Sequence, residues 1–447
     1  MSIESPEWLE DYFTFLRFQS ISSEPEFKQP LLDCAEWLMS YLKTLQFKVE
    51  LWPTPGHPVI FAQNLEAGPS KPTLLIYNHY DVQPVDPLEE WISEPFNPTI
   101  RQGEVYARGA QDNKGQCFYV LQALKRLMKT EGKLPINIKL CIEGEEEVGS
   151  HGLSQIVKDK TKELKADYLA IVDVGIPHAT TPAVTLGIRG ITTMDVEVVG
   201  SQTDLHSGSH GGVVKNPIHA LVELLASLRD AEGRVAVPGF YDDVKNLSEA
   251  ERQQITFDFN PQEYHQVTGA EATGGEKDYS PYERAWIRPT IEVNGIQGGY
   301  SGQGFKTVIP AKAIAKVSCR LVSDQNPQKI GELVARYLEK NAPAGVSVKV
   351  HRHAGGGKAV RISPKAKVVQ AFAQAFAEVF QKPCQYIMAG GSIPVVTELA
   401  EACGGEVLLM GLGLDSDKIH APNEHFGLDR IEKGAQVMLK GIKLLAR

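Results

Sequence analysis

Histidine and acidic residues follow three apolar segments of the sequence, each at the point where the segment ends. His79 and Asp81 follow "PTLLIYN", Glu145-Glu146-Glu147 follow "LPINIKLCIEG", and Asp173 follows "DYLAIV". An imidazole binds a metal through one nitrogen while a nearby carboxylate commonly holds the other ring N–H. A carboxylate beside a metal ligand can act as general base toward water. Taken singly, each motif is equally typical of an ordinary loop or of a solvated helix start, where acids suit the dipole.

Two further residues extend the set. Asp112 lies in "YARGAQDNKGQ", at the start of an expected helix, and His420 lies in "DKIHAPNEHF". A lone Asp at such a place is usually a turn or cap residue. The combined set suits paired zinc or manganese ions, because it offers imidazole and carboxylate donors. One carboxylate bridging ions roughly 3.5–4 Å apart would leave two protein ligands for each ion. The candidate ligands are His79, Asp112, Glu147, Asp173 and His420.

Alternating helix and strand patterns predict the elements that position these residues. Residues 6–18 and 31–45 predict amphipathic helices, and "QCFYVLQALKRLMKT" predicts another after Asp112. "FKVELW", "PVIFAQN" and the three apolar segments above predict strands. This alternation indicates an α/β sheet buried on both faces, in which ligands gather at the carboxyl ends of the strands. The histidine and the acids that follow the strands are therefore expected to converge.

A different pattern begins near residue 184. "GITTMDVEVVG" alternates apolar and polar residues, as a half-exposed antiparallel strand does. The helix "NPIHALVELLASLRD", an irregular stretch at 240–285, two strands and the helix "PQKIGELVARYLEKN" follow. The block is βαββαβ-like and predicts an inserted domain. We expect a catalytic domain in two parts, 1–183 and 357–447, around a second domain at 184–356.

Bulk composition excludes several functional classes. The chain has 447 residues, a net charge of −9 and no basic block, which argues against a nucleic-acid partner. No apolar run reaches the ~18 residues that a membrane span needs, so no membrane partner is expected. The N-terminal residues lack a signal-peptide pattern, and the six cysteines are scattered without a CxxC pair. The expected location is the cytoplasm, with reduced thiols.

The order of the motifs resembles that of a known family. "YNHYDVQPVDPLEEW", "VYARGAQDNKGQ", "EGEEEVGSHG", "IVDVG" and "IHAPNE" are similar to motifs of the cocatalytic metallopeptidases, which include carnosinase, cytosolic nonspecific dipeptidase, succinyl-diaminopimelate desuccinylase and glutamate carboxypeptidase. Further matches are "DLHSGSHGG", "GGYSGQGFKTVIPAKAIAKVSCRLV" and "GGSIPVV", and the dipeptidase branch is the closest. The resemblance implies a mixed-sheet α/β catalytic domain with an inserted α+β lid and dimerisation domain, two divalent metal ions per subunit, and a homodimer.

The resemblance also implies roles for individual residues. It places His79 and Asp173 on one metal, Glu147 and His420 on the other, Asp112 between them, Asp81 behind His79, and Glu146 as general base. It further implies a cis peptide bond between Asp112 and Asn113.

In the inserted domain the resemblance implies contacts with substrate. His206 of "DLHSG" would reach the active site of the neighbouring subunit and hold the developing oxyanion. Arg320 and Thr307 would grip the substrate carboxylate, since the guanidinium fork pairs both oxygens. His353 and Ser392 would line the same pocket. From the residues alone, His206 is equally typical of a surface loop and Arg320 of a strand-surface ion pair.

One departure from the branch bears on specificity. The dipeptidase branch has Arg-Glu before Gly-Gly-Ser-Ile-Pro, whereas this chain has Met388-Ala389. The missing carboxylate removes a partner for a free substrate amine. The sequence therefore predicts a metal-dependent amide hydrolase that cleaves small peptides with a free C-terminal carboxylate. The alternatives are an N-acyl-amino-acid deacylase and a non-catalytic metal-binding member. A nucleotide-binding oxidoreductase is weaker, since no G-x-G-x-x-G opens a helix after a strand.

Overall fold

The computed structural model describes residues 6–353, 356–393 and 395–447. The chain forms two compact units, and each is described by itself. Unit 1 takes in the described residues up to Gly187, then Ile362–Ile387 and Val395–Arg447; unit 2 takes in Ile188–Arg361 and the described part of 388–394. The expected division assigned 388–394 to the catalytic domain, whereas this short segment belongs to unit 2. Its sequence carries no pattern that could have revealed this, because only long-range contacts decide it.

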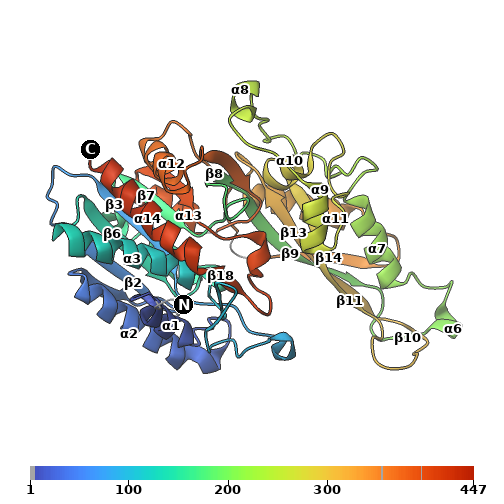
Figure 1. Ribbon diagram of the computed structural model, residues 1–447. Helices are drawn as coiled ribbons and strands as arrows, with labels where there is room; N and C mark the ends of the chain where they lie inside the picture. Colours follow the sequence, from blue (N-terminus) through green and yellow to red (C-terminus); the bar gives the residue numbers. More distant parts are fainter. Residues whose placement is uncertain (1–5, 354–355, 394) are drawn as a thin grey trace. The chain divides into compact units, whose positions relative to one another are not determined.

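Unit 1 is built on a mixed sheet whose centre is parallel. The strands run in the order β1 (Lys48–Trp52), β2 (Val59–Asn64), β6 (Asn137–Glu143), β3 (Thr73–His79), β7 (Tyr168–Val172), β17 (Glu406–Met410) and β8 (Ala183–Ile188), with β16 (Gln385–Ala389) beside β8 (Figure 1). The strands β6, β3, β7 and β17 are mutually parallel. Their carboxyl ends therefore share one edge of the sheet.

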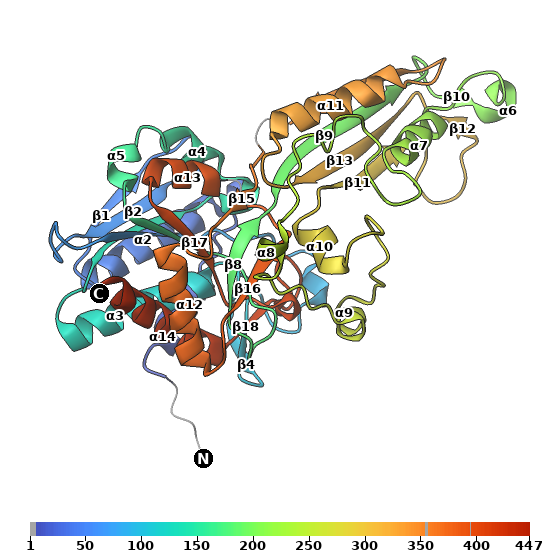
Figure 2. The ribbon, with the colours of Figure 1, turned by 90° about the horizontal axis from the view of Figure 1, so that it is seen from above.

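Helices cover both faces of this sheet, as the nearly continuous burial of its central strands requires. Figure 2 shows α3 (Lys114–Glu131), α12 (Lys367–Phe380) and α14 (Leu428–Leu445) on one side, and α4 (His151–Ile156), α5 (Thr161–Leu164) and α13 (Val396–Cys403) on the other. The predicted N-terminal helices are α1 (Leu9–Arg17) and α2 (Lys28–Thr44). A small sheet of β18 (His425–Gly427), β5 (Glu104–Tyr106) and β4 (Thr99–Arg101) brings the chain around residue 425 beside the segment that precedes Asp112.

Unit 2 carries an antiparallel sheet in the order β11 (Thr290–Gly298), β13 (Lys312–Leu321), β9 (Gly190–Val199) and β14 (Ser347–Arg352). The helices α7 (Pro217–Ser227) and α11 (Pro327–Lys340) contribute to one core with this sheet. β9 alternates strictly between buried and half-buried residues, so Met194, Val196 and Val198 face that core. The chain order β9-α7-β11-β13-α11-β14 is the predicted βαββαβ block. A separate two-stranded ladder joins β10 (Leu205–His206) to β12 (Val308–Ile309).

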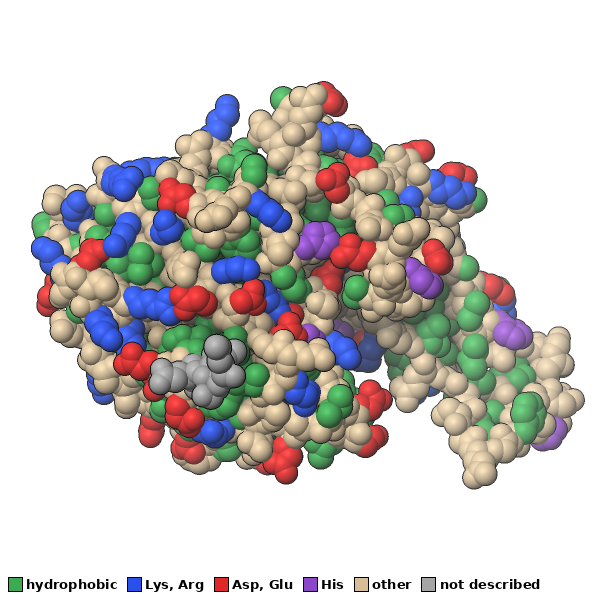
Figure 3. All heavy atoms as spheres, in the orientation of Figure 1, with side chains coloured by type: hydrophobic (Ala, Val, Ile, Leu, Met, Phe, Trp, Pro, Cys, Tyr) green, Lys and Arg blue, Asp and Glu red, His purple; other side chains and the backbone are tan. Residues whose placement is uncertain are grey.

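The expected irregular stretch at 240–285 contains three short helices: α8 (Glu249–Arg252), α9 (Pro261–Thr268) and α10 (Pro281–Trp286). Local capping explains two of them: Ser248 begins a capping box, and Glu283 accepts a hydrogen bond from the backbone N–H of Ser280 (2.9 Å). Among the described residues, no helix is long and apolar enough to cross a bilayer. On the face shown in Figure 3, acidic and basic side chains are interspersed and form no single basic patch.

Candidate metal centre and substrate residues

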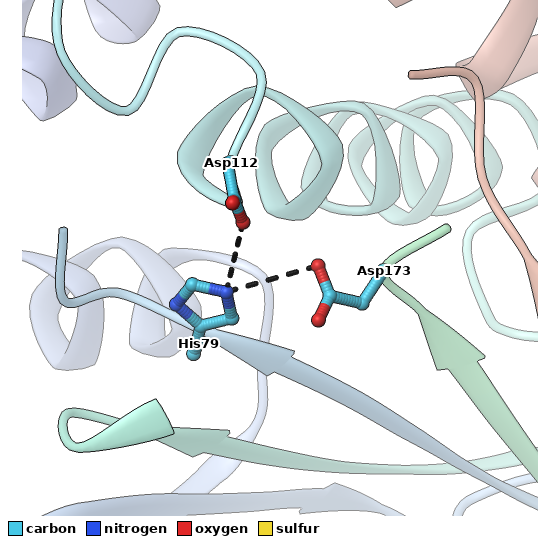
Figure 4. A group of neighbouring side chains, drawn as sticks. All are labelled: His79, Asp112 and Asp173. Atoms are coloured by element: carbon cyan, nitrogen blue, oxygen red, sulfur yellow. Dashed lines mark hydrogen bonds and ion pairs between the residues drawn. The ribbon is translucent and has the colours of Figure 1, made fainter. Parts of the chain in front are cut away.

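His79 lies at the carboxyl end of β3 with its two ring nitrogens in different environments. Nδ1 lies 3.1 Å from the carbonyl oxygen of Asp81 and 3.2 Å from its carboxylate. Both are acceptors, so Nδ1 carries a hydrogen, and Nε2 is the nitrogen that would be available to a metal ion. Nε2 lies 3.2 Å from Oδ1 of Asp112 and 3.7 Å from Oδ1 of Asp173 (Figure 4). This orientation is the one that a metal-binding histidine with a carboxylate behind it adopts.

Asp112 connects this group to a second one. Its Oδ1 faces His79, while its Oδ2 lies 2.9 Å from Nε2 of His420. The same nitrogen of His420 lies 3.2 Å from Oε2 of Glu147. Ligand atoms of His79, Asp112 and Asp173 lie within 4.8 Å of one another, and so do those of Asp112, Glu147 and His420. Two cation-sized groups of nitrogen and oxygen donors therefore share one carboxylate, so the residues fit a pair of divalent ions.

The carboxylates of this cluster need compensating positive charge. Burial, together with the charge of Asp112, raises the pKa of Glu147 to about 7. Burial and the charges of Asp173 and Glu147 raise the pKa of Glu146 well above its ordinary value, against the opposing effect of His79. Hydrogen bonds with Asp112 and Glu147 raise the pKa of His420 to about 10. Carboxylates this close repel one another, so protons or cations must compensate them.

Asp81 joins the two strand ends that carry the site. It is fully buried, and its two carboxylate oxygens accept hydrogen bonds from the backbone N–H groups of Glu146 (3.2 Å) and Glu147 (3.1 Å). The Oδ1 atom also lies 3.2 Å from Nδ1 of His79. Asp81 therefore fixes the orientation of the imidazole and the position of the Glu146–Glu147 turn at once.

The three consecutive acids differ in their surroundings. Glu145 is buried, and its carboxylate accepts hydrogen bonds from the backbone N–H groups of His57 (3.3 Å) and Gly152 (3.0 Å). Glu147 faces His420 and accepts a hydrogen bond from Gln83 (2.8 Å). Glu146 is half-buried, and the charges acting on it come from the candidate ligands. Of the three, Glu145 is therefore the structural one.

Two residues that the sequence prediction did not single out hold the loop of Asp112. The buried carboxylate of Glu424 accepts hydrogen bonds from the backbone N–H groups of Gly109, Gln111 and Asp112 at 2.8–3.0 Å, and pairs with Arg108 at 2.9 Å. Glu424 is the last residue of the "IHAPNE" motif. Its nearness in sequence to His420 is the feature that could have marked it as part of the site.

Asn113 is the second such residue. Its Nδ2 donates to Asp173 Oδ1 (2.5 Å) and to the carbonyl of Val172 (2.8 Å), while its Oδ1 accepts from Asn78 (2.6 Å). The peptide bond between Asp112 and Asn113 is cis, as the resemblance predicts. Asn113 thereby ties the end of β7 to the start of α3.

Unit 2 brings two of the predicted substrate residues together near the β10–β12 ladder. His206 pairs in register with Val308, and the carbonyl of Thr307 accepts a hydrogen bond from the N–H of Ser207 (3.1 Å). Both His206 and Thr307 are exposed. The backbone N–H of Gly208 donates to Nδ1 of His206 (3.0 Å), so Nδ1 is an acceptor and Nε2 carries the hydrogen in the neutral ring. His206 therefore presents an outward N–H donor.

A second pair lies at the end of β13. Nη1 of Arg320 donates to Oγ of Ser392 at 2.8 Å. His353 lies elsewhere, beside β9: its Nε2 is 3.2 Å from Asp195 and its Nδ1 is 3.0 Å from the Thr193 hydroxyl. Within unit 2 the predicted substrate residues thus form the pairs His206–Thr307 and Arg320–Ser392, with His353 paired to neither.

Comparison with known proteins places this geometry in a family. The model of the peptidase family M20/M25/M40 matches residues 75–443. The chain is 30% identical to the Cys-Gly metallodipeptidase DUG1 of Candida albicans, with 97% of this chain and 93% of that protein covered. It is 34% identical to the human Beta-Ala-His dipeptidase, with coverage of 83% and 74%.

A solved structure agrees with these relatives. The M20 family metallo-carboxypeptidase Sso-CP2 from Sulfolobus solfataricus superimposes with a TM-score of 0.90 at 35% identity, covering 99% of this chain and all of that one. These matches confirm the predicted resemblance, its dipeptidase branch and the fold class. The chain belongs to the peptidase family M20/M25/M40.

Proposed function

We infer that this chain is a metal-dependent dipeptidase that cleaves small peptides with a free C-terminal carboxylate. The observation that carries this conclusion is the pair of donor groups that share the Asp112 carboxylate. Its relatives are named for the hydrolysis of Cys-Gly and of β-Ala-His, which are both dipeptides. A dinuclear centre beside a free carboxylate is the arrangement that such hydrolysis requires.

The proposed metals are two zinc or manganese ions per subunit. His79 and Asp173 would hold one, Glu147 and His420 the other, and Asp112 both. When bound, such ions polarise the scissile carbonyl, lower the pKa of the attacking water and neutralise the crowded carboxylates. The mixture of imidazole and carboxylate donors suits either metal.

Glu146 is the proposed general base. It takes a proton from the attacking water as the water adds to the amide carbon, and it returns the proton to the leaving amine. Its half-buried position beside the ligands raises its pKa, which makes it a better proton acceptor. Asp81 keeps the Glu146 backbone in place and holds the tautomer of His79.

His206 is proposed to donate to the developing oxyanion from the partner subunit of a homodimer. The exposed Nε2–H and the fixed Nδ1 support this role, because a preorganised donor loses little on reaction. The edge strand β11 and the exposed face of α7 support the dimer. They carry exposed apolar side chains at Val222, Val293 and Ile296. An uncovered sheet edge with apolar side chains is typical of a pairing surface.

Arg320 is proposed to bind the C-terminal carboxylate of the substrate, with Ser392 beside it. Thr307 and His353 are proposed as further substrate contacts outside this pair. The guanidinium of Arg320 is partly buried, which lowers its pKa, and its hydrogen-bond partner is the neutral Ser392. A desolvated guanidinium without a carboxylate partner favours an incoming carboxylate. The proposed location is the cytoplasm, since all six cysteines are free and five of them are buried.

The experiment that tests the function is hydrolysis of a matched panel. Free dipeptides and the same dipeptides N-acylated are incubated with added zinc, manganese or a chelator. We expect chelator-sensitive cleavage of the free dipeptides. Cleavage confined to the acylated set would move the enzyme to N-acyl-amino-acid hydrolysis, which the replacement of Arg-Glu by Met388-Ala389 would then explain. No cleavage under any metal would contradict both functions.

A further inference from the structure

Two guanidinium groups hold one short segment of unit 2. Arg320 donates from Nη1 to the hydroxyl of Ser392 (2.8 Å). Arg189 donates from Nε to the carbonyl of Gly390 (3.0 Å), and its backbone N–H donates to the carbonyl of Gly391 (3.0 Å). Arg189 therefore contacts Gly390 and Gly391, and Arg320 contacts Ser392, the next residue along. Burial and the charge of Arg320 lower the pKa of Arg189.

The partners of Arg189 are all neutral. Besides the carbonyl of Gly390, they are the carbonyl of Arg288 and the hydroxyl of Thr290, each at 3.4 Å from Nη1. Among the described residues, no carboxylate forms an ion pair with Arg189 or Arg320. The charge of Glu292 raises the pKa of Arg189, but Glu292 forms no ion pair with it. Burial, with the repulsion from Arg320, lowers the pKa of Arg189 to about 10, so the guanidinium stays charged at neutral pH.

Several other cations of unit 2 have carboxylate partners, although the guanidinium of Arg284 also donates to backbone carbonyls alone. Arg288 pairs with Glu276 at 3.0 Å, Lys245 with Asp324 at 3.2 Å, and Arg361 with Glu251 at 2.6 Å. Charged arginines in protein interiors normally find such a partner, because desolvation of a lone cation is costly. The pair Arg189–Arg320 is thus a local excess of positive charge on a chain whose net charge is −9.

Arg189 can be reached from solvent. It is half-buried and is one of the residues that line a small cavity of about 20 Å³, together with Ile188, Leu247, Trp286, Ile287 and Met388. Its Nη2 has no hydrogen-bond partner among the described residues and lies against Gly390, where an added Cβ would sit 3.1 Å from it. The guanidinium therefore keeps an unused donor next to the segment that carries Ser392.

We propose that Arg189 recognises a second carboxylate on the substrate, so that the enzyme prefers dipeptides whose C-terminal residue is aspartate or glutamate. The inference rests on the proposed function, in which Arg320 takes the α-carboxylate. The α- and side-chain carboxylates of such a residue are only two or three carbon atoms apart along the chain. Arg189 and Arg320 bind neighbouring residues of one segment, which gives each carboxylate a guanidinium of its own. A charge-assisted bond to a carboxylate is stronger than a bond to a neutral carbonyl.

A purely positional role for Arg189 makes a different prediction. If its hydrogen bonds only hold residues 390–392, its loss would slow acidic and neutral substrates alike. If it recognises a carboxylate, its loss would act on acidic substrates selectively. The ratio between a charged substrate and its neutral isostere separates the two roles.

The test measures kcat/KM on Ala-Glu, Ala-Gln, Ala-Asp and Ala-Asn with the metal-loaded full chain. We expect each acidic dipeptide to exceed its amide by about tenfold, as one charge-assisted hydrogen bond allows. Arg189→Gln should bring both ratios close to one, because any loss of positioning acts on acid and amide alike. Arg189→Lys, which keeps the charge, should retain part of the preference. Arg361→Gln is the matched control, since that cation lines the same cavity but pairs with Glu251.

Three results would overturn the inference. The first is equal cleavage of acidic and amide substrates by the unaltered enzyme, which leaves the dipeptidase function intact. The second is an equal loss on all four substrates in Arg189→Gln, which assigns the arginine to positioning alone. The third is no cleavage of any of the four under zinc or manganese, which contradicts the proposed function itself.

Discussion

The candidate metal ligands of unit 1 and the proposed substrate residues of unit 2 differ in burial and in the number of their hydrogen bonds. In unit 1, His79 and Asp81 are fully buried, and the loop of Asp112 is held by several hydrogen bonds to Glu424. In unit 2, His206 and Thr307 are exposed, and Arg320 has a single described hydrogen bond. The first group is fixed before substrate arrives, whereas the second leaves its donors available. We therefore propose that preorganisation resides in unit 1 and substrate recognition in unit 2.

The largest expected effect tests the chemical side of this contrast. Glu146→Gln should lower kcat by roughly 10³-fold or more, because it removes the proton acceptor. Metal binding, measured by calorimetric titration, should remain near that of the unaltered enzyme. Glu145→Gln is the matched control, since that neighbour bonds to the backbone at His57 and Gly152. Near-normal turnover of Glu146→Gln would contradict its assignment as base.

The next effect tests whether unit 2 completes the site of a partner. His206→Ala should lower kcat by roughly 10²- to 10³-fold, as the loss of one oxyanion donor does, without a change in metal affinity.

Subunit mixing separates a contribution in trans from one in cis. Inactive Glu146→Ala and His206→Ala subunits, mixed and re-equilibrated, should regain part of the activity if His206 acts across the dimer. The readout is turnover against mixing ratio, with each variant alone as control. No recovery, although light scattering shows mixed dimers, would place His206 in its own subunit.

A smaller effect tests the support behind Asp112. Glu424→Gln weakens an acceptor for three backbone N–H groups and leaves Arg108 without its ionic partner. Metal affinity should fall roughly 10- to 100-fold, the usual result of disturbing residues behind the ligands. Chelator competition measures this affinity. Glu432→Gln, which disturbs the half-exposed pair with Arg126 and a contact with Gln436, should leave it unchanged.

The smallest effect concerns stability alone. Glu143 is buried, and Tyr77 (2.5 Å) and Ser150 (2.9 Å) donate to its Oε1. Burial raises its pKa from 4.5 to about 8. Between these values the folded state holds a proton that the unfolded state releases, so the free energy of unfolding falls as pH rises. Because of this group, the free energy of unfolding should fall by about 2 kcal/mol between pH 5 and pH 7.

Glu143→Gln should remove that pH dependence. Urea unfolding of both proteins in excess chelator, at pH 5 and pH 7, measures it without competition from metals. The variant should gain stability relative to the parent as pH rises. An unchanged difference between the two proteins at both pH values would show that Glu143 is ionised in the folded state.

The sequence by itself determined the elements and the chemistry of unit 1. The apolar runs before His79, Glu146 and Asp173 predicted buried strands with polar ends, and the structure places them as β3, β6 and β7. Parallel strands share their carboxyl ends, so local pattern was enough to predict that these side chains converge. The family motifs added His420, which no local pattern connects to the sheet. The long helix α14 was not predicted, although its apolar spacing is present in the sequence.

Tertiary structure alone decided the surroundings of the three acids and which segments belong together. The resemblance assigned roles to Glu146 and Glu147, whereas only the structure gives the contacts of Glu145 with His57, the charges of the ligand cluster on Glu146 and the contact of Glu147 with His420. Glu424 became a supporting residue because β18 pairs with β5 and brings it under the loop of Asp112. The segment 388–394 joined unit 2, with Arg189 and Arg320 bound to it. The physical reason is common to all three: these contacts join residues far apart in the chain, and residue type and periodicity carry no information about such pairs.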